Sequence, residues 1–159
     1  MQKLEQMGLE KDSTFNGSWP LYALGFHHIK PVNFVSFFNA IANGGKMVSL
    51  KSQDSSAIVV DSMIAEKKNI ESMKKAFRFY VTNGLGKKAE SKMVNVAGTS
   101  GTIHTDDGIY ADFCGYFPVE KPKYTVFVSY KRPEIPVSGG GMAGQTFRKI
   151  AEQIMKTCK

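Results

Sequence analysis

The run Val96-Ala97-Gly98-Thr99-Ser100-Gly101-Thr102 is the stretch of this chain best suited to holding a ligand. It consists of small and β-branched residues, with glycines at positions where a backbone would lie flush against a bound molecule. β-Branched residues favour a strand, so the run is expected to lie within one. We therefore expect a ligand to lie along this stretch, with the other elements arranged around it.

A second possible chemistry is a nucleophilic site made of histidine, aspartate and cysteine. Asp112 and Cys114 are two residues apart, so along a strand they share one face. His104 would complete the site if the register of a hairpin brought it to that face. We expect these residues, together with His27 and His28, to have ordinary packing, loop and turn roles instead.

A third possible chemistry is metal binding. His104, Asp106 and Asp107 would give three ligands in one tight turn, but no second cluster accompanies them. The two cysteines, Cys114 and Cys158, form no CxxC pair and suggest neither zinc nor a redox couple. We therefore expect a solvated hairpin tip, and no metal or cofactor.

The composition fits a single domain over residues 1–159 with its own core, since 42% of the residues are hydrophobic. The net charge is +7, from 21 Lys and Arg against 14 Asp and Glu. The lysines are scattered along polar faces, which favours a solvated basic surface over a nucleic-acid partner. Met1–Met7 lacks the apolar segment of a signal peptide, and no window is long enough to span a membrane. These features leave the location of the chain open.

Apolar residues at helical spacing predict three main helices. The first opens at Lys30-Pro31 and ends at Asn43-Gly44-Gly45, the second spans Asn69–Asn83, and the third ends the chain. Their apolar stripes are, in order, Phe34, Phe37, Phe38 and Ile41; Ile70, Met73, Phe77 and Val81; and Ala143, Phe147, Ile150, Ala151 and Ile154. Gln2–Leu9 is expected to form a short helix and Ser13–Trp19 a loop.

Segments rich in β-branched and aromatic residues predict the strands. They are Lys46–Leu50, Ala57–Val60, Met93–Ala97 continued by Gly101–Thr105, Tyr110–Phe117 and Tyr124–Lys131. Thr105-Asp106-Asp107-Gly108 has the composition of a hairpin turn, and Arg132–Gly141 that of a loop. This order predicts an α+β fold, with an antiparallel sheet of about three strands flanked by helices.

Three segments resemble the C-terminal part of a penicillin-binding protein transpeptidase domain, of the class B, cell-division type. They are Tyr110–Pro118 followed by Pro122–Val126, Gly139–Ala151, and Pro31–Met47 with its Asn-Gly-Gly-Lys turn. The resemblance covers almost the whole chain in collinear order. It implies a partial penicillin-binding/β-lactamase-like transpeptidase fold and a relation to the cross-linking of peptidoglycan in the cell envelope.

The resemblance implies three motifs, S-x-x-K, S-x-N and K-T-G. In the family the serine attacks a D-alanyl-D-alanine carbonyl, and the third motif holds the terminal carboxylate and helps to hold the oxyanion. By alignment Thr99 replaces the lysine of the third motif, Ser100 its threonine and Gly101 its glycine, and Thr102 follows with the backbone N–H. Thr99 cannot carry the charge, and a neutral hydrogen bond is about half as strong as a charge-assisted one.

The first two motifs precede the matched region in the family. Ser72-Met73-Lys74-Lys75 has the S-x-x-K spacing, but the helical pattern directs Ser72 and Lys75 to solvent, and no S-x-N occurs. Two hypotheses follow. The favoured one is a transpeptidase fragment, inactive alone, with at most a residual groove for a stem peptide or β-lactam. The alternative is an active acyl-serine D,D-transpeptidase or carboxypeptidase with an unrecognised nucleophile.

The resemblance also implies that two strands of a five-stranded sheet lie earlier than the matched region. The edge of Tyr124–Lys131 would then be open, and the helix with Phe34, Phe37 and Phe38 would be partly uncovered. We expect a homo-oligomer, most simply a two-fold dimer that pairs these edges, or association with a complementing transpeptidase half. The alternative is that Gln2–Trp19 or Lys46–Val60 folds back over the edge.

Overall fold

The computed structural model describes Met7 and residues 29–50, 58–132 and 137–158. The expected loop Ser13–Trp19, His27, His28 and, except for Met7, the expected helix Gln2–Leu9 lie outside the described residues. No described helix has the length and apolar character needed to cross a membrane.

The three predicted helices are confirmed as α3 (Pro31–Ala42), α4 (Lys67–Asn83) and α5 (Gly144–Thr157). α3 begins with a proline, whose missing N–H is harmless in the first turn, and it ends before two glycines with φ of 70° and 102°. One stripe position is wrong: Met73 is 38% exposed, because the buried side of α4 consists of Ile70, Phe77 and Val81.

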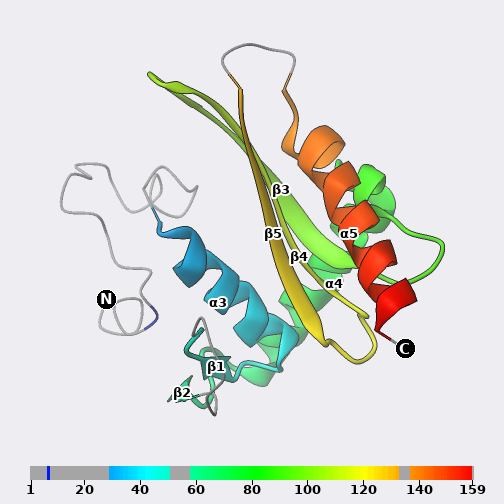
Figure 1. Ribbon diagram of the computed structural model, residues 1–159. Helices are drawn as coiled ribbons and strands as arrows, with labels where there is room; N and C mark the ends of the chain where they lie inside the picture. The colour runs from blue at the N-terminus through cyan, green and yellow to red at the C-terminus, as the bar shows by residue number, and fades with distance from the viewer. Residues whose placement is uncertain (1–6, 8–28, 51–57, 133–136, 159) are drawn as a thin grey trace.

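The three long strands form one antiparallel sheet in the order β3 (Ala97–Thr105), β4 (Gly108–Phe117) and β5 (Tyr124–Arg132) (Figure 1). The predicted α+β class is therefore confirmed. The expected start at Met93 is wrong. The Met93 N–H donates to the Ser91 hydroxyl at 3.0 Å, so local side-chain bonds hold this segment in bends until the ladder begins at Ala97.

Among the described residues, the two weak strands pair with each other and with no third strand. β1 (Met47–Val48) and β2 (Val59–Asp61) form a separate two-stranded antiparallel sheet. The expectation that Lys46–Val60 folds over the outer edge of β5 is therefore wrong for its described residues. The alternative cover, Gln2–Trp19, lies outside the described residues apart from Met7.

The sheet is covered on both faces (Figure 1). On one face, Phe113 and Phe117 of β4 pack on Phe147 of α5, with ring centroids 4.9 and 5.7 Å apart. On the other face, α3 and the middle of α4 close the second core cluster around Cys114 and Tyr116. The sheet residues of each cluster come from one face of the sheet, as strand alternation requires, and helix side chains complete it.

The aromatic stripe of α3 is better covered than expected. Phe38 is 2% exposed and stacks on Phe77 of α4, with the ring centroids 4.8 Å apart. Phe34 contacts Phe127 of β5 edge-on at 5.9 Å, and Phe37 is partly buried against the same cluster. α4 and β5 thus cover Phe38 fully, while Phe34 and Phe37 stay partly exposed, so the expected uncovered area is limited to these two side chains.

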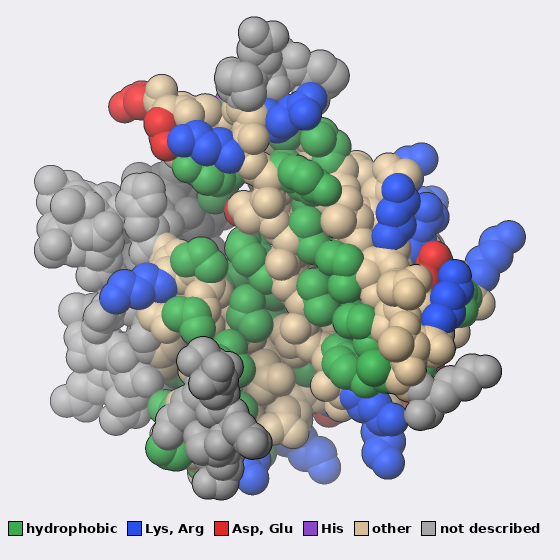
Figure 2. Space-filling model, viewed as in Figure 1, with side chains coloured by type: hydrophobic (Ala, Val, Ile, Leu, Met, Phe, Trp, Pro, Cys, Tyr) green, Lys and Arg blue, Asp and Glu red, His purple; other side chains and the backbone are tan. Residues whose placement is uncertain are grey.

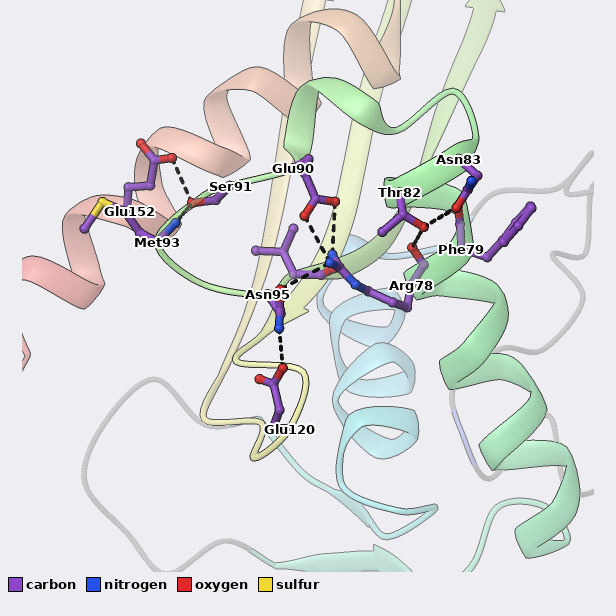
Figure 3. A network of polar contacts seen from close by, with 11 residues as sticks. Arg78, Phe79, Thr82, Asn83, Glu90, Ser91, Met93, Asn95, Glu120 and Glu152 are labelled. Carbon is purple, nitrogen blue, oxygen red and sulfur yellow. Dashed lines mark hydrogen bonds and ion pairs between the residues drawn. The ribbon is translucent and has the colours of Figure 1, made fainter.

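A polar network fastens α4 to the start of β3 (Figure 3). Arg78 donates two hydrogen bonds to the Glu90 carboxylate, at 3.0 and 3.1 Å, and one to the Val96 carbonyl oxygen at 2.8 Å. It also donates to the Asn95 side-chain oxygen at 3.2 Å, and Asn95 in turn donates to Glu120 in the turn after β4. Val96 directly precedes β3, so this network sets where the strand enters the sheet.

Candidate functional site

Thr99–Thr102 lie together on β3, which is an edge strand of the three-stranded sheet. Residues directly paired across an antiparallel ladder point to the same face. Ser100 and Thr102 pair with Phe113 and Ala111, whose face is covered by α5. The other two residues of the run, Thr99 and Gly101, face the side of α3 and α4.

The register also fixes the direction of the main-chain groups. Thr105 and Gly108 flank a two-residue turn and form a hydrogen-bonded pair. Along an antiparallel ladder, hydrogen-bonded pairs alternate with non-hydrogen-bonded pairs. In agreement, the Gly101 and Asp112 carbonyl oxygens lie at the β3–β4 seam, beneath Gly139. Ser100 and Thr102 therefore direct their N–H and C=O groups to the outer edge of β3, away from β4.

The Ser100 hydroxyl has a partner that the sequence analysis did not identify. Tyr80 of α4 places its hydroxyl 2.5 Å from the Ser100 Oγ, and either oxygen can donate. Each hydroxyl carries one proton. One of these two protons forms the hydrogen bond between the oxygens, so the other can be donated to a third group. No local signal pointed to Tyr80, because the two residues are 20 positions apart and belong to different elements.

A glycine-rich turn packs over the same strand. In η2 (Gly139–Ala143), a π-helical turn, the Gly139 N–H donates to the Thr102 Oγ1 at 3.1 Å. A side chain at Gly139 would lie 2.2 Å from the Gly101 carbonyl oxygen, and one at Gly140 would lie 2.4 Å from the Leu85 carbonyl oxygen. Both positions therefore need glycine for the turn to lie against β3.

The structure separates the residues of the hypothetical His-Asp-Cys site. His104 pairs with Ile109 and so lies on the opposite face of the sheet from Asp112 and Cys114. Cys114 is 1% exposed, and burial raises the pKa of its thiol well above the usual range. Burial also raises the pKa of Asp112, against a hydrogen bond from Ser129 that lowers it. These three residues therefore form no nucleophilic centre.

The Asp107 carboxylate at the hairpin tip bonds to neighbouring side chains of the same sheet. Asp107 accepts a hydrogen bond from Lys131 at 2.6 Å and others from Thr105 and Tyr110, and these bonds lower the pKa of Asp107 to about 2. Among the described residues no group of His, Cys, Asp and Glu is arranged to hold a metal ion. Asp106 and His104 are exposed, as expected for a solvated tip.

Ser72 and Lys75, which have the S-x-x-K spacing, lie on the exposed side of α4, as the helical pattern predicts. The Ser72 hydroxyl donates to the Lys68 carbonyl oxygen at 2.8 Å. A shallow groove of about 530 Å³ runs beside this helix. It is lined by Glu71, Lys74, Lys75, Arg78, Phe79, Thr82, Tyr116, Val119 and Glu120. None of the four motif residues of β3 contributes to it.

Comparison with known proteins decides the family. A profile of the penicillin-binding protein transpeptidase domain matches residues 1–156. The chain belongs to this family. The resemblance noted from the three segments is thus confirmed over residues 1–156 of this chain. A comparison with curated proteins finds no match.

Several solved structures share the fold. The transpeptidase domain of the FtsI4 D,D-transpeptidase from Legionella pneumophila is 27% identical with a TM-score of 0.77, covering 97% of this chain and 59% of that chain. Penicillin-binding protein 3 from Burkholderia pseudomallei, an apo transpeptidase domain, is 18% identical with a TM-score of 0.76, over 99% and 56%. A peptidoglycan glycosyltransferase from Burkholderia ambifaria is 19% identical with a TM-score of 0.74, over 99% and 55%. The chain therefore spans little more than half the length of these structures.

Proposed function

We propose that this chain supplies the sheet side of a peptidoglycan transpeptidase cleft of the cell-division type, and that it is inactive alone. The observation that carries this proposal is the outer edge of β3, to which Ser100 and Thr102 direct their main-chain groups and with which no strand of the described residues pairs. An extended peptide could pair with that edge through its backbone. The Thr102 N–H would contact the substrate oxygen, and the strand would hold the peptide carboxylate.

The chemistry of this strand favours weak binding. Thr99 brings no positive charge, so the carboxylate would be held by neutral donors, including the proton left over in the Tyr80–Ser100 pair. A site of this kind fits a stem peptide or a β-lactam, because both present a carboxylate beside a carbonyl group. It would bind either one less tightly than a site with a lysine.

The proposed inactivity rests on the serine chemistry. Acyl transfer needs a serine whose base lies within hydrogen-bond reach. Ser72 bonds to a backbone carbonyl on the exposed side of α4, and Ser100 faces a tyrosine rather than a lysine. On this proposal the nucleophile comes from a complementing transpeptidase half, in a longer protein or a second chain at the cell envelope.

Labelling with a fluorescent penicillin tests the inactivity. We expect no label that survives denaturation, whereas an active D,D-transpeptidase treated in parallel should be labelled. The 2.5 Å contact between Tyr80 and Ser100 supports a second candidate, an acyl-serine enzyme that uses Ser100. A label that disappears in Ser100→Ala but persists in Ser72→Ala would establish that candidate and contradict the proposal.

Titration with a D-alanyl-D-alanine peptide tests the binding. We expect the amide signals of Ser100 and Thr102 to shift in NMR spectra, and Thr99→Lys to raise the affinity about fivefold at low salt by adding a charge-assisted bond. Thr99→Gln is the matched neutral control and should leave the affinity within twofold. Peptide shifts confined to other elements, or an equal gain in both variants, would contradict binding at β3.

A further inference from the structure

The Tyr80–Ser100 hydroxyl pair is held in place by the loop that follows α4. The Tyr80 carbonyl oxygen accepts hydrogen bonds from the Gly84 and Gly86 N–H groups, at 3.0 and 3.2 Å. A Cβ at Gly86 would lie 2.7 Å from the Cδ1 atom of the Tyr80 ring, so the main chain of the loop packs directly on the ring. Tyr80 also packs against the core cluster on the α5 side of the sheet. These contacts fix the phenol beside Ser100.

The pair can present either a proton or a lone pair to a ligand. Its two oxygens are 2.5 Å apart, and either can donate. If Tyr80 donates to Ser100, the Ser100 hydroxyl can donate onward. If Ser100 donates to Tyr80, the Ser100 Oγ can instead accept a hydrogen bond from a ligand. A lysine ammonium has no such choice, because it only donates.

The polar partners of the motif residues are neutral. Within the described part of the chain, the side-chain hydrogen bonds of Ser100 and Thr102 join only the Tyr80 hydroxyl and the Gly139 N–H. Figure 2 shows a similar distribution on one whole side of the molecule, with hydrophobic side chains gathered along the middle of the view and Lys and Arg side chains near its margin. The net charge of +7 is therefore not concentrated over the middle of that side.

The register adds an acidic group on the Thr99 face of the sheet. Asp112 pairs with Gly101, so it lies on the same face as Thr99, at a diagonal position where residues are about 7–8 Å apart. Its Oδ1 atom is buried with no hydrogen-bond partner among the described residues, and burial raises the pKa of this carboxyl group. An ionised Asp112 repels a ligand carboxylate, and a protonated one is neutral. In neither state does it supply the positive charge that a carboxylate needs.

We propose that the Tyr80–Ser100 pair lets the β3 site accept an uncharged amide end of a peptide as well as a carboxylate end. This ligand class rests on the proposed function, since the same strand would hold the peptide. A carboxamide both accepts, through its oxygen, and donates, through its N–H groups. Ser100 accepts from a carboxamide N–H while its own proton goes to the Tyr80 oxygen. The outward main-chain groups of Ser100 and Thr102 likewise include both donors and acceptors.

Titration with a D-alanyl-D-alanine peptide acid, and with the same peptide as its C-terminal amide, tests this specificity through the Ser100 and Thr102 amide signals in NMR spectra. We expect the two dissociation constants to agree within about fivefold, because the stronger bonds of a carboxylate are offset by its larger cost of desolvation. Thr99→Lys should raise the preference for the acid about fivefold over the wild type, and Thr99→Gln, the neutral control, less than about twofold. A larger wild-type preference for the acid, or equal preferences in the two variants, overturns the inference.

Tyr80→Phe tests the role of the hydroxyl pair, because it keeps the ring that packs against Gly86. Without the phenol oxygen, Ser100 can still donate to a carboxylate, but its own proton has lost its acceptor when it accepts from an amide N–H. We expect the amide to bind about fivefold more weakly and the acid less than about twofold more weakly. A packing defect would weaken both ligands equally, so an equal effect, or none, overturns the inference.

The two peptides also separate this inference from the proposed function. Binding of the acid alone would overturn the inference and leave the proposed function standing. An absence of shifts with either peptide would contradict both. The comparison of the peptides on the wild type and on the Thr99 variants remains decisive even if Tyr80→Phe does not fold.

Discussion

Gly98→Ala should destabilise the protein by about 3 kcal/mol, the upper end of the range for added atoms in a packed interior. A Cβ at this position would lie 2.4 Å from the Cys114 carbonyl oxygen and 2.8 Å from the Gly115 Cα. Both are main-chain atoms of the neighbouring strand, so they cannot move aside as a flexible side chain could. For a chain of this size the loss corresponds to a fall in melting temperature of about 6–12 °C.

Gly101→Ala is the matched control on the same strand. A Cβ there would have no atom within 4 Å, so we expect its melting temperature to stay within about 2 °C of the wild type. Thermal unfolding followed by circular dichroism measures both variants. Equal effects at the two glycines would show that close strand packing does not govern β3, and would weaken the account of how the motif residues are placed.

Arg78→Met should reduce the free energy of unfolding by about 2 kcal/mol. The variant keeps much of the apolar stem but removes the guanidinium that donates to Glu90, Val96 and Asn95. The Glu90 carboxylate and the Val96 carbonyl oxygen would then lose a charged donor in a partly buried position. The Arg78 and Glu90 side chains are 27% and 35% exposed, so solvent limits the loss.

Lys75→Met, on the exposed side of the same helix, is the control and should change the stability by less than about 0.5 kcal/mol. Urea unfolding measures both variants. Amide NMR signals of Val96 and Gly98 should also shift in Arg78→Met alone, since Arg78 holds the entry of β3. A stable Arg78→Met with unchanged signals would show that the network does not position the strand.

Local chemistry was enough to predict the main elements from the sequence. Pro31, the aromatic spacing after it and the paired glycines at 44 and 45 define α3, because each acts within a few residues of its position. The Asp-Asp-Gly turn and the β-rich runs define the hairpin and β5 in the same way. The segments that carry the family resemblance are also local sequence patterns, so the family could be predicted without the fold.

Tertiary structure alone decided how the candidate site is built. The pairing of His104 with Ile109 depends on the hairpin register, and a shift by one residue would have moved His104 to the other face. The contact of Tyr80 with Ser100 and the reach of Lys131 to Asp107 join residues from separate elements, 20 and 24 positions apart. Such contacts arise only when packing brings the elements together, so helical or strand periodicity does not encode them. The position of β3 at an edge of the described sheet is likewise a property of the assembled fold, because the neighbours of a strand are known only once the strands have paired.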